Sequence, residues 1–200
     1  MAQYKVILAS NSPRRKELLA GLGIDYDVHV LKGIDESFPP SLPTAQIAEY
    51  IAGKKAENYR RSMGADELII TADTIVVVDD EVLGKPHDEA DARRMLCLLS
   101  GRTHQVITGV VLTTTLRQES FSVITDVTFK SLSDEEIDYY VTNFRPFDKA
   151  GAYGIQEWIG YIGVTALNGS YFNVMGLPVQ RIYEALKRFG INPCDGTRSR

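Results

Sequence analysis

Residues 68–78 read Leu-Ile-Ile-Thr-Ala-Asp-Thr-Ile-Val-Val-Val, a nearly continuous run of apolar and β-branched residues. Such a run is typical of a strand that is buried on both faces of a sheet. Asp73 interrupts the run, and a carboxylate is costly to bury unless hydrogen-bond donors or a cation lie beside it. Asp73 therefore either serves donors nearby or lies where the strand opens into a cleft. The small residues Ala72 and Thr74 on either side leave room for a ligand.

The rest of the chain alternates between strand-like and helix-like patterns around this segment. Turn residues separate the patterns, and the proline-rich stretch 33–43 reads as a loop. We predict strands over residues 4–9, 26–31, 104–116 and 119–132, a β-rich stretch over 159–173, and helices that begin at Ser12, Asp88 and Gly176. Thr44 is expected to cap a helix that runs to about Met63, and Ser133 and Glu136 fit a capping box at the start of another. The sequence shows neither repeats nor a clear linker. We therefore expect one α/β domain over residues 1–191, followed by a mobile tail over 192–200.

The segment after the first predicted strand has features of an anion site. It reads Ser10-Asn11-Ser12-Pro13-Arg14-Arg15-Lys16. Ser12 is a good N-cap and Pro13 a good first helical residue, so free N–H groups and the positive end of the helix dipole would face outward here. Basic residues in a first helical turn oppose that dipole unless an anion offsets them. The segment is either a phosphate cradle or an ordinary capped helix with solvated arginines.

Composition limits the classes of protein to consider. The chain has 200 residues, 44% of them hydrophobic, and a net charge of −4. This charge argues against a nucleic-acid binder, because such proteins neutralise many backbone phosphates with Lys and Arg. The apolar runs are too short to span a membrane and the start does not resemble a signal peptide, so we expect a cytoplasmic protein. Cys97 and Cys194 suggest neither a disulfide framework nor a zinc cluster, and Cys97, set among leucines, is expected in the core.

Further polar residues stand at positions that loops would present. Lys85 lies in a Gly-Lys-Pro turn, and the pair Asp148-Lys149 precedes a glycine-punctuated stretch that ends in Gln156. Lys55 lies within a predicted helix, where a solvated surface lysine is the simpler interpretation. Neither a Walker-type phosphate loop, nor a dinucleotide fingerprint, nor a serine-hydrolase elbow occurs.

Seven short motifs, taken together and in order, resemble the Maf family of nucleoside triphosphate pyrophosphatases over nearly the whole chain. They are Ser10-x-Ser12-Pro13-Arg14-Arg15, Ala72-Asp73-Thr74, Gly84-Lys85-Pro86, Ser100-Gly101-x-Thr103-His104, Asp148-Lys149-Ala150-Gly151-Ala152-Tyr153-Gly154-Ile155-Gln156, Asn168-Gly169-Ser170-Tyr171 and Gly176-Leu177-Pro178. The chain departs from the family pattern at Asn11 and at Glu157-Trp158.

The resemblance implies a fold similar to inosine triphosphate pyrophosphatases, with a mixed twisted sheet, flanking helices and a cleft between two lobes. It implies cleavage of a nucleoside triphosphate into the monophosphate and pyrophosphate with a divalent metal such as Mg²⁺ or Mn²⁺. The segment 149–156 resembles the subgroup that acts on dTTP and UTP. The alternatives are a 7-methyl-GTP pyrophosphatase and a non-catalytic nucleotide-binding regulator of septum formation. The oligomeric state stays open, with a homodimer as one option.

Family roles transfer to matching positions only. Asp73 matches the proposed general base, although it would serve equally as a metal ligand, and Arg14, Thr74 and Gln156 match positions linked to substrate choice. We expect Asp73 and Lys85 to be catalytic and Glu36 to hold the metal. The expected substrate-binding residues are Ser10, Ser12, Arg14, Arg15, Lys55, Thr74, Lys149 and Gln156.

Overall fold

The computed structural model describes residues 4–192 and residue 194. Their contacts group the chain into two compact units, each described below by itself. Within the described residues, the first unit takes in residues 4–73, 108–122 and those from 176 onward, and the second takes in Thr74–Ile107 and Val123–Met175. The single domain expected over residues 1–191 stays a prediction. The expected tail lies outside the described residues except for Asn192 and Cys194.

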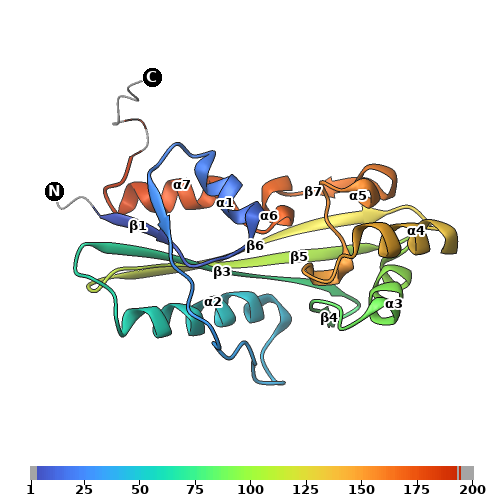
Figure 1. The fold of residues 1–200 in the computed structure, drawn as a ribbon, viewed down its shortest axis with the longest axis horizontal. Coiled ribbons are helices and arrows are strands. Elements are labelled where there is room, and N and C mark those ends of the chain that lie inside the picture. Colours follow the sequence, from blue (N-terminus) through green and yellow to red (C-terminus); the bar gives the residue numbers. More distant parts are fainter. Residues whose placement is uncertain (1–3, 193, 195–200) are drawn as a thin grey trace. The chain divides into compact units, whose positions relative to one another are not determined.

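In the part of the chain that the structure describes, seven strands form one mixed sheet, as expected. Their order is β2-β1-β3-β5-β6-β7, with β4 paired to β3. β1 runs parallel to β2 and β3, whereas β4 and β7 run antiparallel to β3 and β6. The strands are β1 (Lys5–Leu8), β2 (Tyr26–Val28), β3 (Glu67–Val78), β4 (Glu81–Leu83), β5 (Thr103–Thr113), β6 (Gln118–Phe129) and β7 (Val164–Asn168). Strands and helices interleave along the chain, so the predicted α/β class is confirmed (Figure 1).

Helices cover both faces of the sheet in the first unit. α2 (Thr44–Arg60) lies on one face, and α1 (Pro13–Ala20) and α7 (Val179–Arg188) lie on the other (Figure 1). α2 approaches β5 at Gly109, where an added Cβ would lie only 2.2 Å from the backbone nitrogen of Glu49. The helix contacts the strand backbone at this point because glycine has no side chain.

α2 differs from the prediction at both ends. Thr44 is the first helical residue and Pro43 occupies the N-cap position, because proline's fixed φ suits the turn that enters the helix. The helix ends at Arg60, three residues before the predicted end at Met63.

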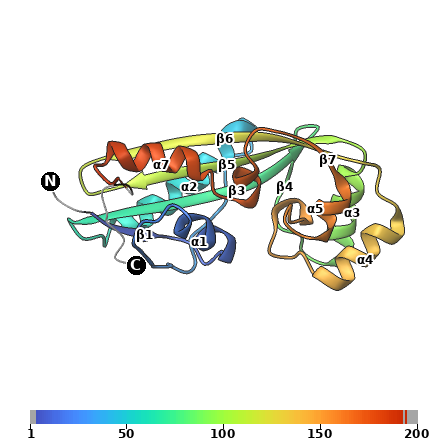
Figure 2. The ribbon, with the colours of Figure 1, turned by 90° about the horizontal axis from the view of Figure 1, so that it is seen from above.

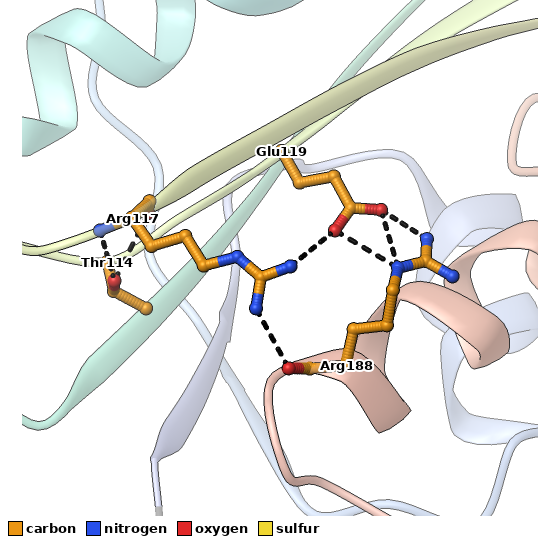
Figure 3. Close-up of polar contacts among 4 residues, drawn as sticks. All are labelled: Thr114, Arg117, Glu119 and Arg188. Atoms are coloured by element: carbon orange, nitrogen blue, oxygen red, sulfur yellow. Dashed lines mark hydrogen bonds and ion pairs between the residues drawn. The ribbon is translucent and has the colours of Figure 1, made fainter.

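The end of α7 is attached to the turn between β5 and β6. The guanidinium of Arg117 donates a 2.9 Å hydrogen bond to the carbonyl of Arg188 and also pairs with Glu119 (Figure 3). Arg188 pairs with the same carboxylate. Thr114 closes the turn, because its Oγ1 accepts the N–H of Arg117 at 3.0 Å. A side chain far away in sequence thus caps the last carbonyl group of the helix, that of Arg188.

In the second unit, α3 (Glu89–Leu99) and α4 (Asp134–Phe144) lie side by side (Figure 2). Ser133 and Glu136 form the predicted capping box at the start of α4. His104 is buried in this unit's core, and its Nε2 lies 2.7 Å from the hydroxyl of Tyr153. Burial lowers the pKa of His104 to about 4.

Two predictions in the second unit are wrong. Cys97 is exposed, because the buried face of α3 carries Met95, Leu96 and Leu99. The stretch 159–173 is strand only at β7, which the helices α5 (Trp158–Gly163) and α6 (Tyr171–Met175) flank. Its aromatic and β-branched residues favour strands, but tertiary packing overrides that preference. Ile159, for example, is fully buried in the core of the unit from a helical turn.

Within the described residues, helices are either too short or too polar to cross a membrane.

Candidate active site

The helix start predicted after β1 is present in the first unit. Ser12 caps α1, because its Oγ accepts the N–H of Arg15 at 3.4 Å, and Pro13 is the first helical residue. Ser10 is buried and its Oγ accepts the N–H of Ser12 at 3.2 Å. Both hydroxyl oxygens therefore accept backbone N–H groups within the turn. Each hydroxyl also has a hydrogen that it could donate to an anion.

Arg15 ties this helix to the rest of the unit. Its Nε and one terminal nitrogen each donate a 2.8 Å hydrogen bond to a backbone carbonyl, that of Gly176 and that of Ala72. Ala72 directly precedes Asp73, so the bond holds α1 against the central strand. Burial lowers the pKa of Arg15, whereas the negative charge of Asp73 acts in the opposite direction. The positive charge of Arg14 also lowers this pKa, and the negative charge of Glu36 raises it.

Asp73 has a cationic partner. The Lys55 Nζ lies 2.7 Å from Asp73 Oδ1 and 2.9 Å from Glu36 Oε1. The side chains of Lys55 and Asp73 are only 13% and 15% exposed, whereas that of Glu36 is 54% exposed. The interpretation of Lys55 as a solvated surface lysine is therefore wrong. We call Glu36, Lys55 and Asp73 the Lys55 triad.

The sequence shows why these three residues meet. Side chains alternate along β3, so Ile69, Thr71 and Asp73 share one face. Thr71 on this face donates a 2.8 Å hydrogen bond to the Ala52 carbonyl of α2, which carries Lys55 one turn further along. The proline-rich loop before α2 supplies Glu36, and the triad therefore combines a strand, a helix and a loop.

The second unit holds another buried lysine. Lys149 is 8% exposed, and its Nζ lies 2.7 Å from Asp148 Oδ1 and 3.0 Å from Glu157 Oε1. The loop of Lys85 lies beside this segment, because the Gly84 carbonyl accepts the N–H of Gly151 at 3.0 Å. Lys85 itself is exposed. The structure thus brings the two loop lysines onto neighbouring segments.

Gln156 and Thr74, the remaining predicted residues, also belong to this unit. The Oε1 of Gln156 is buried and has no hydrogen-bond partner among the described residues. A buried acceptor of this kind is unfavourable until a donor reaches it. Thr74 is partly buried and follows Asp73 on β3, so its side chain points to the opposite face of that strand.

The predicted residues therefore fall into two sets. The first unit brings together the helix start at residues 10–15 and the Lys55 triad, and the second brings together the segments of Lys85 and Lys149. Sequence reasoning missed Glu157, which it noted only as a departure from the family pattern. The one available signal was the acidic side chain itself, directly after Gln156. The roles of all these residues toward a nucleotide stay predictions.

Comparison with known proteins identifies the family. The model of the Maf-like protein family matches residues 5–189. A dTTP/UTP pyrophosphatase of Phocaeicola vulgatus is 65% identical over 188 residues, which cover 94% of this chain and 97% of that protein. Proteins of the same name from Bacteroides thetaiotaomicron and Porphyromonas gingivalis are 58% and 52% identical, over 93% and 95% of this chain and 96% of each relative. The chain, with its capped helix start and its partly buried strand aspartate, therefore belongs to the Maf-like protein family.

Proposed function

We propose that this protein hydrolyses dTTP and UTP, and modified pyrimidine nucleotides of the same shape, to the nucleoside monophosphate and pyrophosphate. The observation that carries the proposal is the identity of 52–65% to three relatives named dTTP/UTP pyrophosphatase, each covered almost completely. Such names do not favour a 7-methyl-GTP pyrophosphatase or a non-catalytic regulator of septum formation. The charged clusters of both units support a reaction on a polyanion.

Phosphoryl substitution depends on positioning and on neutralising the charge of phosphate oxygens. In the first unit we assign this task to Arg14, Arg15 and Lys55, with the N–H groups and hydroxyls at the start of α1. Arg15 already holds two carbonyl groups, so it fixes the cradle as well as contributing charge. We assign the same task to Lys85 and Lys149 in the second unit.

Asp73 is our candidate for the group that orients and deprotonates the attacking water. Lys55 binds its Oδ1, which fixes the carboxylate, and we assign Oδ2 to the water. A general base must lie within hydrogen-bond reach of the proton it accepts, and a carboxylate held by a neighbouring ammonium meets that need for preorganisation. Its alternative role as a metal ligand stays open.

The two carboxylates of the triad, those of Glu36 and Asp73, also fit a divalent metal ion that the substrate helps to hold. Among the described residues, no group of three His, Cys, Asp or Glu side chains could hold a metal by itself. Mg²⁺, however, is usually bound by one or two carboxylates together with substrate phosphates, and Glu36 and Asp73 lie within 3 Å of one nitrogen. Such an ion, Mg²⁺ or Mn²⁺, would neutralise charge on the phosphate oxygens.

Gln156 is our candidate for the residue that reads the base. A glutamine amide offers an acceptor and a donor, which complement the N3–H and O4 of uracil or thymine. Its buried Oε1 lacks a donor among the described residues, and the N3–H of a pyrimidine would supply one. We further place the protein in the cytoplasm, where these nucleotides occur, and leave the homodimer as an open alternative.

The test is release of pyrophosphate from dTTP, UTP, CTP, GTP and 7-methyl-GTP, with Mg²⁺, with Mn²⁺ and with a chelator. We expect turnover of dTTP and UTP that needs a metal, and a loss of about a hundredfold or more in Asp73→Asn. Asp35→Asn is the matched control, because Asp35 pairs with Lys54, the neighbour of Lys55, at 2.7 Å. Turnover of 7-methyl-GTP alone, or near wild-type activity of Asp73→Asn, would contradict the proposal. Unchanged base preference in Gln156→Ala would remove its assigned role.

A further inference from the structure

Lys149 lies in a built polar network rather than on the surface. Its ammonium group binds two carboxylates, those of Asp148 and Glu157. They differ in surroundings, because the Asp148 side chain is 58% exposed and that of Glu157 is 23% exposed. The less exposed carboxylate defines the direction of the lysine side chain more strictly, because solvent competes less for it.

Glu157 is itself fixed by Tyr140 of α4. The Tyr140 hydroxyl donates a short hydrogen bond to Glu157 Oε2 and accepts the N–H of Gly154 at 3.1 Å. Tyr140 is fully buried, and burial together with Glu157 raises the pKa of its hydroxyl, which therefore stays a neutral donor. Each oxygen of Glu157 thus has its own donor, Lys149 on Oε1 and Tyr140 on Oε2.

Packing at Gly154 keeps this arrangement compact. A Cβ at this position would lie 2.9 Å from Glu157 Cδ and 3.1 Å from Lys149 Cε. The ion pair of Lys149 and Glu157 therefore occupies the space that a side chain at position 154 would need. An ammonium group carries three hydrogens, and among the described residues two carboxylates take one each.

We propose that Glu157, supported by Tyr140, is a positioning residue that aims the third hydrogen of the Lys149 ammonium at a phosphate oxygen of the nucleotide. This inference rests on the proposed function and extends it to two residues outside the seven family-like motifs. An ammonium held in one direction stabilises developing charge without reorganising, so its effect appears in kcat. Removing the negative charge of Glu157 does not weaken the ground-state attraction of an anion, so KM is not expected to rise.

The test is a double-mutant cycle with steady-state turnover of dTTP as the measurement. We expect Glu157→Gln to lower kcat by about tenfold to a hundredfold, the loss of one charge-assisted hydrogen bond, with KM unchanged or lower. In a Lys149→Met background the same substitution is expected to change kcat by less than about twofold, because Glu157 then has nothing to orient.

Tyr140→Phe provides a second variant should Glu157→Gln fail to fold. It is expected to lower kcat in the same direction and to lose this effect in the Lys149→Met background. Tyr153→Phe is the control, because it also deletes a buried hydroxyl with a partner, His104, and so reports on stability alone. We expect its kcat to stay within about twofold of wild type while its melting temperature falls.

Three outcomes would overturn the inference. Wild-type kcat in both Glu157→Gln and Tyr140→Phe would do so, and so would an equal loss of kcat with and without Lys149. A wild-type protein that releases no pyrophosphate from dTTP or UTP would overturn the proposed function and this inference with it. If the wild-type protein turns over dTTP but the effects of Glu157→Gln and Lys149→Met on kcat are additive, this inference alone is overturned. The two failures are therefore distinguishable.

Discussion

Gly109→Ala is expected to be among the most destabilising single-methyl changes in the first unit. The added Cβ would lie 2.2 Å from the Glu49 nitrogen and 2.3 Å from the Ala48 carbonyl carbon. These are atoms of the α2 backbone, which cannot rotate away as a side chain can. Restoring ordinary contact requires a shift of roughly 1 Å between helix and strand. We expect a loss of about 3 kcal/mol in the free energy of unfolding, the upper end of the range for overpacking.

Because α2 also carries Lys55, the same shift is expected to lower turnover of dTTP. Gly53→Ala is the matched control, since Gly53 lies inside α2 and a Cβ there meets nothing within 4 Å. This variant is expected to gain up to about 1 kcal/mol, because glycine is a poor helix residue. Urea denaturation with equal m-values measures both changes. A Gly109→Ala protein as stable as wild type would refute the close approach of α2 to β5.

Three further predictions concern stability. Arg117→Ala is expected to lower the free energy of unfolding by about 1 kcal/mol, because the Arg188 carbonyl at the end of α7 is left uncapped. Thermal melting is expected to show a lower midpoint, and an unchanged midpoint would show that this bond does not stabilise the protein. Ser133→Ala is expected to cost about 1 kcal/mol through loss of the capping box with Glu136, and Ser133→Asp, which can still cap, is expected to lose less. Because the pKa of His104 is lowered to about 4, the neutral ring stabilises the fold above pH 6.5, and about 3 kcal/mol is lost as the pH falls from 6.5 to 4. Urea denaturation across this range is expected to show a flatter pH dependence in His104→Gln, and an identical slope would remove that explanation.

Local sequence predicted the elements whose signals are themselves local. The apolar run at residues 68–78 became β3, the Ser12-Pro13 start became α1, and the capping box at Ser133 opened α4. Each depends on neighbouring residues alone, because caps, turns and alternation act over a few positions. The β-rich prediction for 159–173 holds only for β7, for the same reason. The composition of the stretch favours strands, while burial of Ile159 by distant parts of the unit favours the helical form of α5.

The candidate site likewise has features that the sequence determined and features that only the tertiary structure decided. Sequence by itself singled out Asp73, because a carboxylate in an apolar strand needs a partner. The polar residues that would serve a nucleotide came from the resemblance of its motifs to the Maf family. Only the tertiary structure decided which partner Asp73 has, since Lys55 lies 18 positions away and reaches it only when α2 packs on the sheet. It alone also decided that Lys149 pairs with Glu157 and that Tyr140, from a separate segment, holds Glu157. Hydrogen bonds and ion pairs act over about 3 Å in space and carry no trace in a pattern along the chain.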